Sequence, residues 1–228
     1  MSSKLLSTIT NAYALVLDKR IGYWKELRES FQSKGINLQL FLSGDGHLQE
    51  LYSYGHIDHD ILPPIYPNGI QYETWYKTPN PMNCWLAQKK ILQRTLMDGL
   101  DHVLLIEDDS IIEEDFDEVL SKAEPFFQDN KWDAIYFGAY HNPNSWEPTN
   151  NEAIIRLKGS GGFHGVLLTK RLIEDLVEVL PIGPLDWQMG YFHNIYDCFA
   201  IYPSIISQKS GFSYIENSPL TKPSRYHR

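Results

Sequence analysis

An apolar run that stops at three consecutive carboxylates is the feature that most constrains how this chain folds. Residues 103–106 (Val-Leu-Leu-Ile) are followed at once by Glu107, Asp108 and Asp109. A short aliphatic run of this kind is typical of a strand buried on both faces, as in parallel sheets. In open α/β sheets, ligands bind beyond the carboxyl ends of such strands. We therefore expect an α/β fold whose binding edge carries these three acids.

The three adjacent acids predict a cation site. Neighbouring carboxylates repel one another, and gathering them at one place costs stability. A divalent cation, which prefers oxygen ligands, offsets that repulsion. The alternative is a solvated acidic turn in which an Asp caps the helix that follows.

Length, charge and cysteine usage narrow the class of protein. A chain of 228 residues is long enough for one domain with a substantial core. The net charge of −9 argues against a binder of nucleic-acid backbones, which normally displays a basic face. Cys84 and Cys198 lack the spacing of a metal-ligand pair and suit a reducing compartment.

No targeting or membrane-spanning segment is apparent in the sequence. The start of the chain has no apolar region of signal-peptide length, and no stretch approaches roughly 18 apolar residues. We therefore expect a cytoplasmic protein without a membrane span. The basic, aromatic residues 226–228 leave peripheral membrane attachment as an alternative.

Apolar patterning predicts alternating strands and helices. The chain opens with a strand at 12–17, an amphipathic helix at 21–34 and a strand at 36–42, a β-α-β order that predicts parallel pairing. The other elements that we expect are helices at 83–99, 116–127, 170–180 and 185–193, and strands at 132–137, 153–157, 163–169, 198–202 and 205–206.

Residues 43–81 predict a long irregular segment. It is rich in Gly, Pro and aromatic residues, and loops of this length in compact domains are usually lids or binding loops. Disorder without a ligand is the alternative. The His-Ile-Asp-His-Asp run at 56–60 lacks the helical setting of known His-based metal motifs, so we do not expect a separate metal site there.

The order of several motifs resembles glycosyltransferase family 25, which includes bacterial lipooligosaccharide and collagen galactosyltransferases. The acidic block is the most specific of them, and the family's Ser-His pair is replaced here by Ala87-Gln88. The blocks span about residues 12–215 and are LVLDKR at 15–20, NCWLAQKKI at 83–91, GLD at 99–101 leading into LLIEDD at 104–109, GGFHGVLLTKR at 161–171, PLDW at 184–187, and YP at 202–203 followed by Gln208.

The resemblance implies a GT-A type fold: a Rossmann-like mixed, mainly parallel sheet flanked by helices in one domain. A nucleotide-sugar half would cover about residues 10–110, and an acceptor half about residues 111–228. The implied donor is a UDP-sugar carrying galactose or glucose, and the implied cofactor is Mn²⁺ or Mg²⁺. The acceptor would be a hydroxyl of a glycan, a lipid-linked sugar or a protein.

The resemblance also assigns roles at the acidic block. If the strand end stays extended, side-chain alternation places Glu107 and Asp109 on one side and Asp108 on the other. Asp109 is then the strongest metal ligand, and Glu107 reaches the metal through water or the ribose. Asp108 faces the sheet or the donor sugar. Gln208 is the expected third ligand, with His193 and His227 as weaker candidates.

Further donor-binding and catalytic residues follow from the same resemblance. Arg20 pairs with a phosphate or stacks on uracil; solvated cations beside a capping Asp18 are the alternative. Asp186 takes the proton from the acceptor hydroxyl in an inverting transfer, and its alternative is a helix N-cap beside a core Trp. The remaining expected residues are Leu17, Asp18, Lys89, Gly161 and Gly162 for the donor, and Trp187 and His164 for the acceptor.

For Lys89 and the glycine segment, plainer interpretations stay open. Lys89 either meets phosphate or is solvated. Residues 159–162 either allow close approach of a ligand or form a tight turn.

Two other functions compete with the transferase. A non-catalytic nucleotide-sugar-binding module fits the Ala87-Gln88 replacement and the neutral Gln208 ligand. A Mg²⁺-dependent nucleotidyltransferase would need a Gly-rich, Lys- or Arg-bearing loop after the first strand, which the sequence lacks. A serine hydrolase is disfavoured because no Gly-x-Ser-x-Gly motif occurs.

Overall fold

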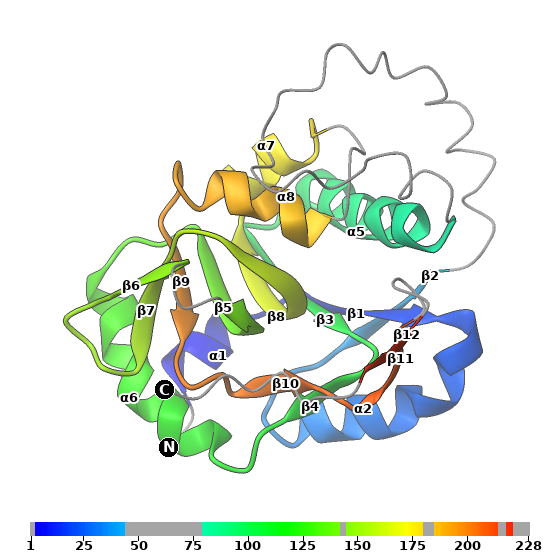
Figure 1. Cartoon of the computed structure of the whole chain (residues 1–228), viewed down its shortest axis with the longest axis horizontal. Coiled ribbons are helices and arrows are strands. Elements are labelled where there is room, and N and C mark those ends of the chain that lie inside the picture. Colours follow the sequence, from blue (N-terminus) through cyan, green and yellow to red (C-terminus); the bar gives the residue numbers. More distant parts are fainter. Residues whose placement is uncertain (1–2, 44–78, 142–144, 180–184, 214–217, 221–228) are drawn as a thin grey trace.

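A mixed sheet with helices on both faces forms the centre of the molecule (Figure 1). The computed structural model describes residues 3–43, 79–141, 145–179, 185–213 and 218–220. Within these residues the main sheet has eight strands in the order β2-β1-β3-β8-β5-β9-β7-β6. The predicted α/β fold class is confirmed. The strands are β1 (Ala12–Leu17), β2 (Gln39–Ser43), β3 (His102–Glu107), β5 (Ala134–His141), β6 (Trp146–Pro148), β7 (Ile154–Leu157), β8 (Ser160–Thr169) and β9 (Cys198–Ile201).

The parallel opening that the sequence predicted is confirmed. β1 pairs in parallel with both β2 and β3, and β5 pairs in parallel with β9. The other neighbours in the sheet are antiparallel. Because β1, β2 and β3 run the same way, Leu17, Ser43 and Glu107 end their strands at one edge.

Helices cover the two faces of the sheet because the strand side chains alternate between them. In β1, Ala14 and Val16 pack on one face, and Tyr13 and Leu15 pack on the other. The first face is covered by α1 (Lys4–Thr8), α2 (Trp24–Gln32) and α6 (Phe116–Asp129), and the second by α5 (Pro79–Met97), α7 (Lys170–Leu176) and α8 (Leu185–Phe192) (Figure 1).

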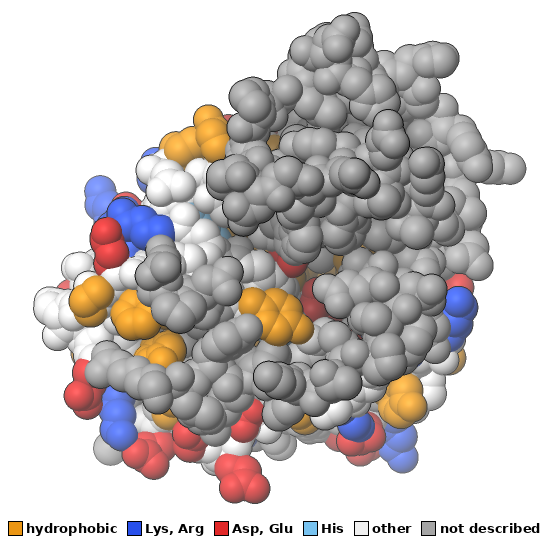
Figure 2. All heavy atoms as spheres, in the orientation of Figure 1, with side chains coloured by type: hydrophobic (Ala, Val, Ile, Leu, Met, Phe, Trp, Pro, Cys, Tyr) orange, Lys and Arg blue, Asp and Glu red, His pale blue; other side chains and the backbone are white. Residues whose placement is uncertain are grey.

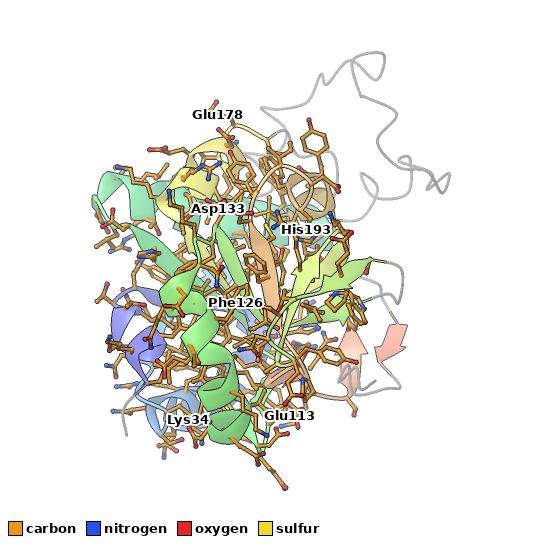
Figure 3. The ribbon with its side chains drawn as sticks, turned by 90° about the vertical axis from the view of Figure 1, so that its left-hand side faces the viewer. Lys34, Glu113, Phe126, Asp133, Glu178 and His193 are labelled. Carbon is orange, nitrogen blue, oxygen red and sulfur yellow. The ribbon has the colours of Figure 1, made fainter. Side chains whose placement is uncertain are left out.

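Packing between α6 and β9 illustrates the first face. Phe126 of α6, labelled in Figure 3, meets Phe199 of β9 edge-on, and the ring centroids are 5.0 Å apart. Such aromatic pairs stabilise the fold by about 1 kcal/mol beyond the contribution of the apolar area that they bury. None of the helices in the described ranges is long and apolar enough to cross a bilayer. Charged side chains of both signs are mixed along the lower rim of the face in Figure 2.

Several element boundaries differ from the predictions. The predicted helix 21–34 is divided into a 3₁₀ helix η1 (Asp18–Tyr23) and α2. Gly35 follows with a φ of +81°, a conformation that glycine tolerates, and the second strand then begins only at Gln39. The strand predicted at 132–137 instead runs over Ala134–His141, and the helix predicted at 170–180 ends at Leu176.

The end of the segment predicted to be irregular is helical, because α5 begins at Pro79. Residues 44–78, and with them the His-Asp run at 56–60, lie outside the described residues.

Two small antiparallel pairs complete the architecture. β4 (Ser110–Ile112) pairs with β10 (Ile206–Gln208), and β11 (Gly211–Ser213) pairs with β12 (Ser218–Leu220). β10 approaches β5 and β8 where these strands carry glycine. A Cβ on Gly138 would lie 1.9 Å from the Ile206 carbonyl oxygen, and one on Gly165 would lie 2.8 Å from Ile206 Cδ1. The two glycines therefore allow the close approach that brings Gln208 opposite Ser110.

Candidate functional site

The three acids lie at the predicted edge of the sheet. Glu107 is the last residue of β3, and it pairs in register with Leu15 of the parallel β1. Residues 108–109 form a turn before β4. The alternation expected from an extended chain therefore ends at Glu107, and the prediction that Asp108 and Asp109 face opposite sides is wrong. We call Glu107, Asp108 and Asp109 the acid turn.

Arg20 connects the end of β1 to this acid turn. Its Nη1 atom donates to Asp108 Oδ1 at 2.6 Å and to Asp109 Oδ2 at 3.0 Å. The Leu17 amide donates to Asp108 Oδ2 at 2.9 Å, so both oxygens of Asp108 accept hydrogen bonds. Burial lowers the pKa of the Arg20 guanidinium, but its attraction to the two acids outweighs burial and raises that pKa overall.

Asp109 is contacted by Gln208 at the end of β10 and by Lys209, which follows it. Gln208 Nε2 donates to Asp109 Oδ2 at 3.2 Å, and the Lys209 amide donates to the Asp109 carbonyl at 2.7 Å. The Tyr140 hydroxyl donates to Gln208 Oε1, which orients the carboxamide with its NH₂ group toward Asp109. Asp109 Oδ1 is buried and has no hydrogen-bond partner in the described part of the chain.

Glu107 contacts a buried histidine on β8. His164 Nδ1 lies 2.9 Å from Glu107 Oε2, and the histidine side chain is 1% exposed. Because an ionised carboxylate can only accept, the imidazole donates from Nδ1. His164 Nε2 is buried and has no partner in the described ranges. The acceptor-binding role expected for His164 stays a prediction.

Burial and repulsion between neighbouring acids make Asp108 and Asp109 harder to ionise. Burial raises the pKa of Asp108 to about 6, although the Leu17 amide and Arg20 oppose that rise. Burial and then repulsion by Glu107 raise the pKa of Asp109. Three carboxylates thus face one guanidinium, and an added cation would lower both pKa values.

Asp186 is positioned by β8. It is the second residue of α8, and its Oδ2 accepts a hydrogen bond from the Gly162 amide at 2.7 Å. Gly162 has a φ of +85°, which disfavours other residues. The N-cap alternative for Asp186 is therefore wrong, because the residue lies inside the helix and its carboxylate binds a strand amide. Gly161 lies beside this contact in the same strand.

Asp18, Lys89 and Trp187 were also predicted to lie in the site. Asp18 is exposed at the start of η1. Lys89 lies 4.8 Å from the centroid of the Trp85 ring and donates to the Val179 carbonyl, and among the described residues it makes no hydrogen bond to the acid turn. The side chain of Trp187 lies outside the description.

Of the two alternative metal-binding histidines, one is described. His193 Nε2 is 3.0 Å from the Tyr136 hydroxyl in the core, and His227 lies outside the described residues.

Sequence reasoning missed the groups that hold the acid turn in place. Tyr140 and the Lys209 amide reach it only because β10 crosses β5, and no local motif marks that crossing. The available signal was a pair of glycines, Gly165 inside the predicted strand 163–169 and Gly138 directly after the predicted strand 132–137.

The acid turn suits a cation that is bound partly by protein carboxylates and partly by phosphate oxygens of a ligand. Among the described residues, no group of three or more His, Cys, Asp or Glu is arranged to hold a metal. Mg²⁺ commonly binds through one or two carboxylates together with substrate phosphates rather than in a protein cage. Asp109 Oδ1, which has no partner within the described ranges and has Glu107 near it, suits that mode of binding.

Comparison with known proteins gives distant likenesses in structure. The sequence matches no protein-family model, and no curated protein is significantly similar to it. A197 from STIV is 13% identical, with a TM-score of 0.45, 96% of this chain and 95% of that chain being covered. UDP-glucose pyrophosphorylase from Acinetobacter baumanii is 14% identical, with a TM-score of 0.46 and 85% of each chain covered.

A third solved structure is a glycosyltransferase involved in the glycosylation of the major capsid of PBCV-1. It is 8% identical, with a TM-score of 0.39, and the alignment covers 85% of this chain and 82% of that one. Because all three TM-scores are low, we interpret the site from its own residues.

Proposed function

We propose that this chain is a metal-dependent glycosyltransferase that moves a hexose, galactose or glucose, from a UDP-sugar to a hydroxyl acceptor. One observation carries the proposal. The acid turn lies at the carboxyl edge of parallel strands, and a buried carboxylate oxygen of Asp109 has no hydrogen-bond partner among the described residues. Such an edge is where α/β sheets bind nucleotides.

The cation is assigned to Asp109, with Glu107 beside it. Mn²⁺ or Mg²⁺ bound there would neutralise the charge that develops on the departing diphosphate. Arg20 is next to the same position and offers a guanidinium that pairs well with phosphate oxygens. Gln208 supports Asp109 through its amide, and a direct ligand role requires its carboxamide to turn over.

Asp186 is the proposed general base. The hydrogen bond from the Gly162 amide to Asp186 Oδ2 fixes the direction of the carboxylate. In an inverting transfer, Asp186 takes the proton from the acceptor hydroxyl as that oxygen attacks the sugar.

The order of motifs supports a place near glycosyltransferase family 25. We propose a glycan, a lipid-linked sugar or a protein as the acceptor, with Trp187 beside Asp186 as a stacking surface for a sugar ring. A cytoplasmic location belongs to the same proposal.

A non-catalytic binding module is the second candidate. The pairing of Arg20 with both Asp108 and Asp109 favours it, since an internal cation already balances part of the acid turn. A measurement of turnover distinguishes the glycosyltransferase from the binding module, because only the enzyme would release UDP as it transfers the sugar.

The experiment compares the native chain with Asp186→Asn. UDP release from UDP-galactose and UDP-glucose is measured with Mn²⁺ and a panel of sugar acceptors. Loss of the base is expected to reduce kcat about 10²- to 10⁴-fold while donor affinity is kept. Asp98→Asn, at an exposed position after α5, is the control and should retain full activity. Donor binding without turnover on any acceptor would favour the binding module.

A further inference from the structure

One histidine holds both ends of the acid turn. The His164 side chain contacts Glu107, which precedes the two turn residues. The His164 carbonyl accepts a 2.6 Å hydrogen bond from the hydroxyl of Ser110, which follows them. The imidazole also lies edge-on to the Tyr140 ring, with centroids 4.8 Å apart. β8 thus contacts the acid turn on either side of its two aspartates.

Stability alone does not account for a histidine at this position. The side chain is 1% exposed, and its Nε2 atom is buried without a partner in the described ranges. An unsatisfied buried polar group destabilises the folded state, and a buried apolar side chain would avoid that cost. What the imidazole supplies is a donor that is aimed at a carboxylate.

Gly162 links this contact to Asp186. It lies two residues before His164 on the same face of β8, and its amide binds Asp186. A Cβ at Gly162 would lie 2.9 Å from Tyr140 Cδ2 and 3.1 Å from His164 Nε2. The glycine therefore leaves room for both rings while it holds the proposed base.

We propose that His164 is a positioning residue that fixes the Glu107 carboxylate at the donor end of the site. Together with Gly162, it sets the separation between the acid turn and Asp186. The consequence for donor binding rests on the proposed glycosyltransferase function. Groups that orient a metal-binding carboxylate or histidine typically change metal affinity about 10- to 100-fold when they are removed.

Two substitutions at one position test the proposal. His164→Leu removes the donor, whereas His164→Asn keeps an amide NH₂ close to the place of Nδ1. Calorimetry with Mn²⁺ alone, and with Mn²⁺ plus UDP-galactose, should show affinity about 10- to 100-fold lower for His164→Leu and largely restored in His164→Asn. His102→Leu is the matched control at the other end of β3 and should bind as the native chain does. Thermal unfolding checks that each variant is folded.

Equal affinity in all these proteins would overturn the proposal, and so would equal losses in both His164 variants, which would indicate packing alone.

NMR of the metal-free native chain separates this proposal from the function on which it rests. Long-range ¹H–¹⁵N spectra should show a proton on His164 Nδ1, which donates to Glu107. A bare Nδ1 overturns the positioning role even if the donor binds. A protonated Nδ1 in a chain that binds neither Mn²⁺ nor UDP-sugar supports the positioning of Glu107 and rejects the glycosyltransferase.

Discussion

At the scale of single residues, burial and hydrogen bonding have opposite effects on the ionisation of Asp108. Its two oxygens accept hydrogen bonds from the Leu17 amide and from Arg20, yet burial still raises its pKa to about 6. The sequence predicted three acids at a strand end. It did not predict which protein groups oppose their charge, because Arg20 lies 88 positions from Asp108 along the chain.

The raised pKa of Asp108 predicts how stability depends on pH. The folded state holds this proton at pH values where the unfolded chain, with an ordinary pKa of 3.8, has lost it. In chelator, the free energy of unfolding should therefore fall as pH rises from about 4 to about 6, by about 3 kcal/mol for this carboxyl. Asp108→Asn should flatten the decline in denaturant titrations. Parallel curves for the two proteins would contradict the assignment.

At the scale of elements, the site depends on the short strand β10, which packs closely against β5 and β8. β10 delivers Gln208 to Asp109, and it reaches that position because Gly138 and Gly165 carry no side chain. The opening β-α-β unit was predictable from local patterning. The crossing was not, since it joins residues near 138 to residues near 206 through contacts that no periodicity encodes.

Gly138→Ala tests this crossing. The added Cβ would meet a backbone carbonyl at 1.9 Å, which cannot move aside as a side-chain tip can. We expect a loss of about 3 kcal/mol in the free energy of unfolding. Gly190→Ala in α8 is the control: it has open space and should gain about 0.5–1 kcal/mol from helix propensity. Equal stability of Gly138→Ala and the native chain in urea would refute the close approach.

At the scale of the whole molecule, the two halves of the chain share one sheet. β8, from the second half, lies between β3 of the first half and β5. Ile36 and Ile91 are fully buried in the cores on opposite faces of that sheet. Hydrophobic patterning predicted both layers, but not the pairing of β8 with β3 that joins the two halves, because strand order depends on long-range contacts.

A single cooperative unfolding transition is expected because β3 and β8 join the two halves in one sheet and both halves contribute to each core. Ile36→Val and Ile91→Val should each lower the free energy of unfolding by about 1 kcal/mol, because each removes one buried methyl group. Calorimetry should show the same single transition shifted in both variants. Two separable transitions, each sensitive to one of the variants, would show that the two cores unfold independently.

The central claim is that the acid turn binds a nucleotide sugar through a divalent cation at Asp109. Calorimetry of UDP-galactose and UDP-glucose, with Mn²⁺ and then with chelator, on the native chain and on Asp109→Ala tests it most directly. We predict binding to the native chain that requires the metal and disappears in Asp109→Ala. Absence of binding by either donor under both conditions, or unchanged binding in the variant, would contradict the account.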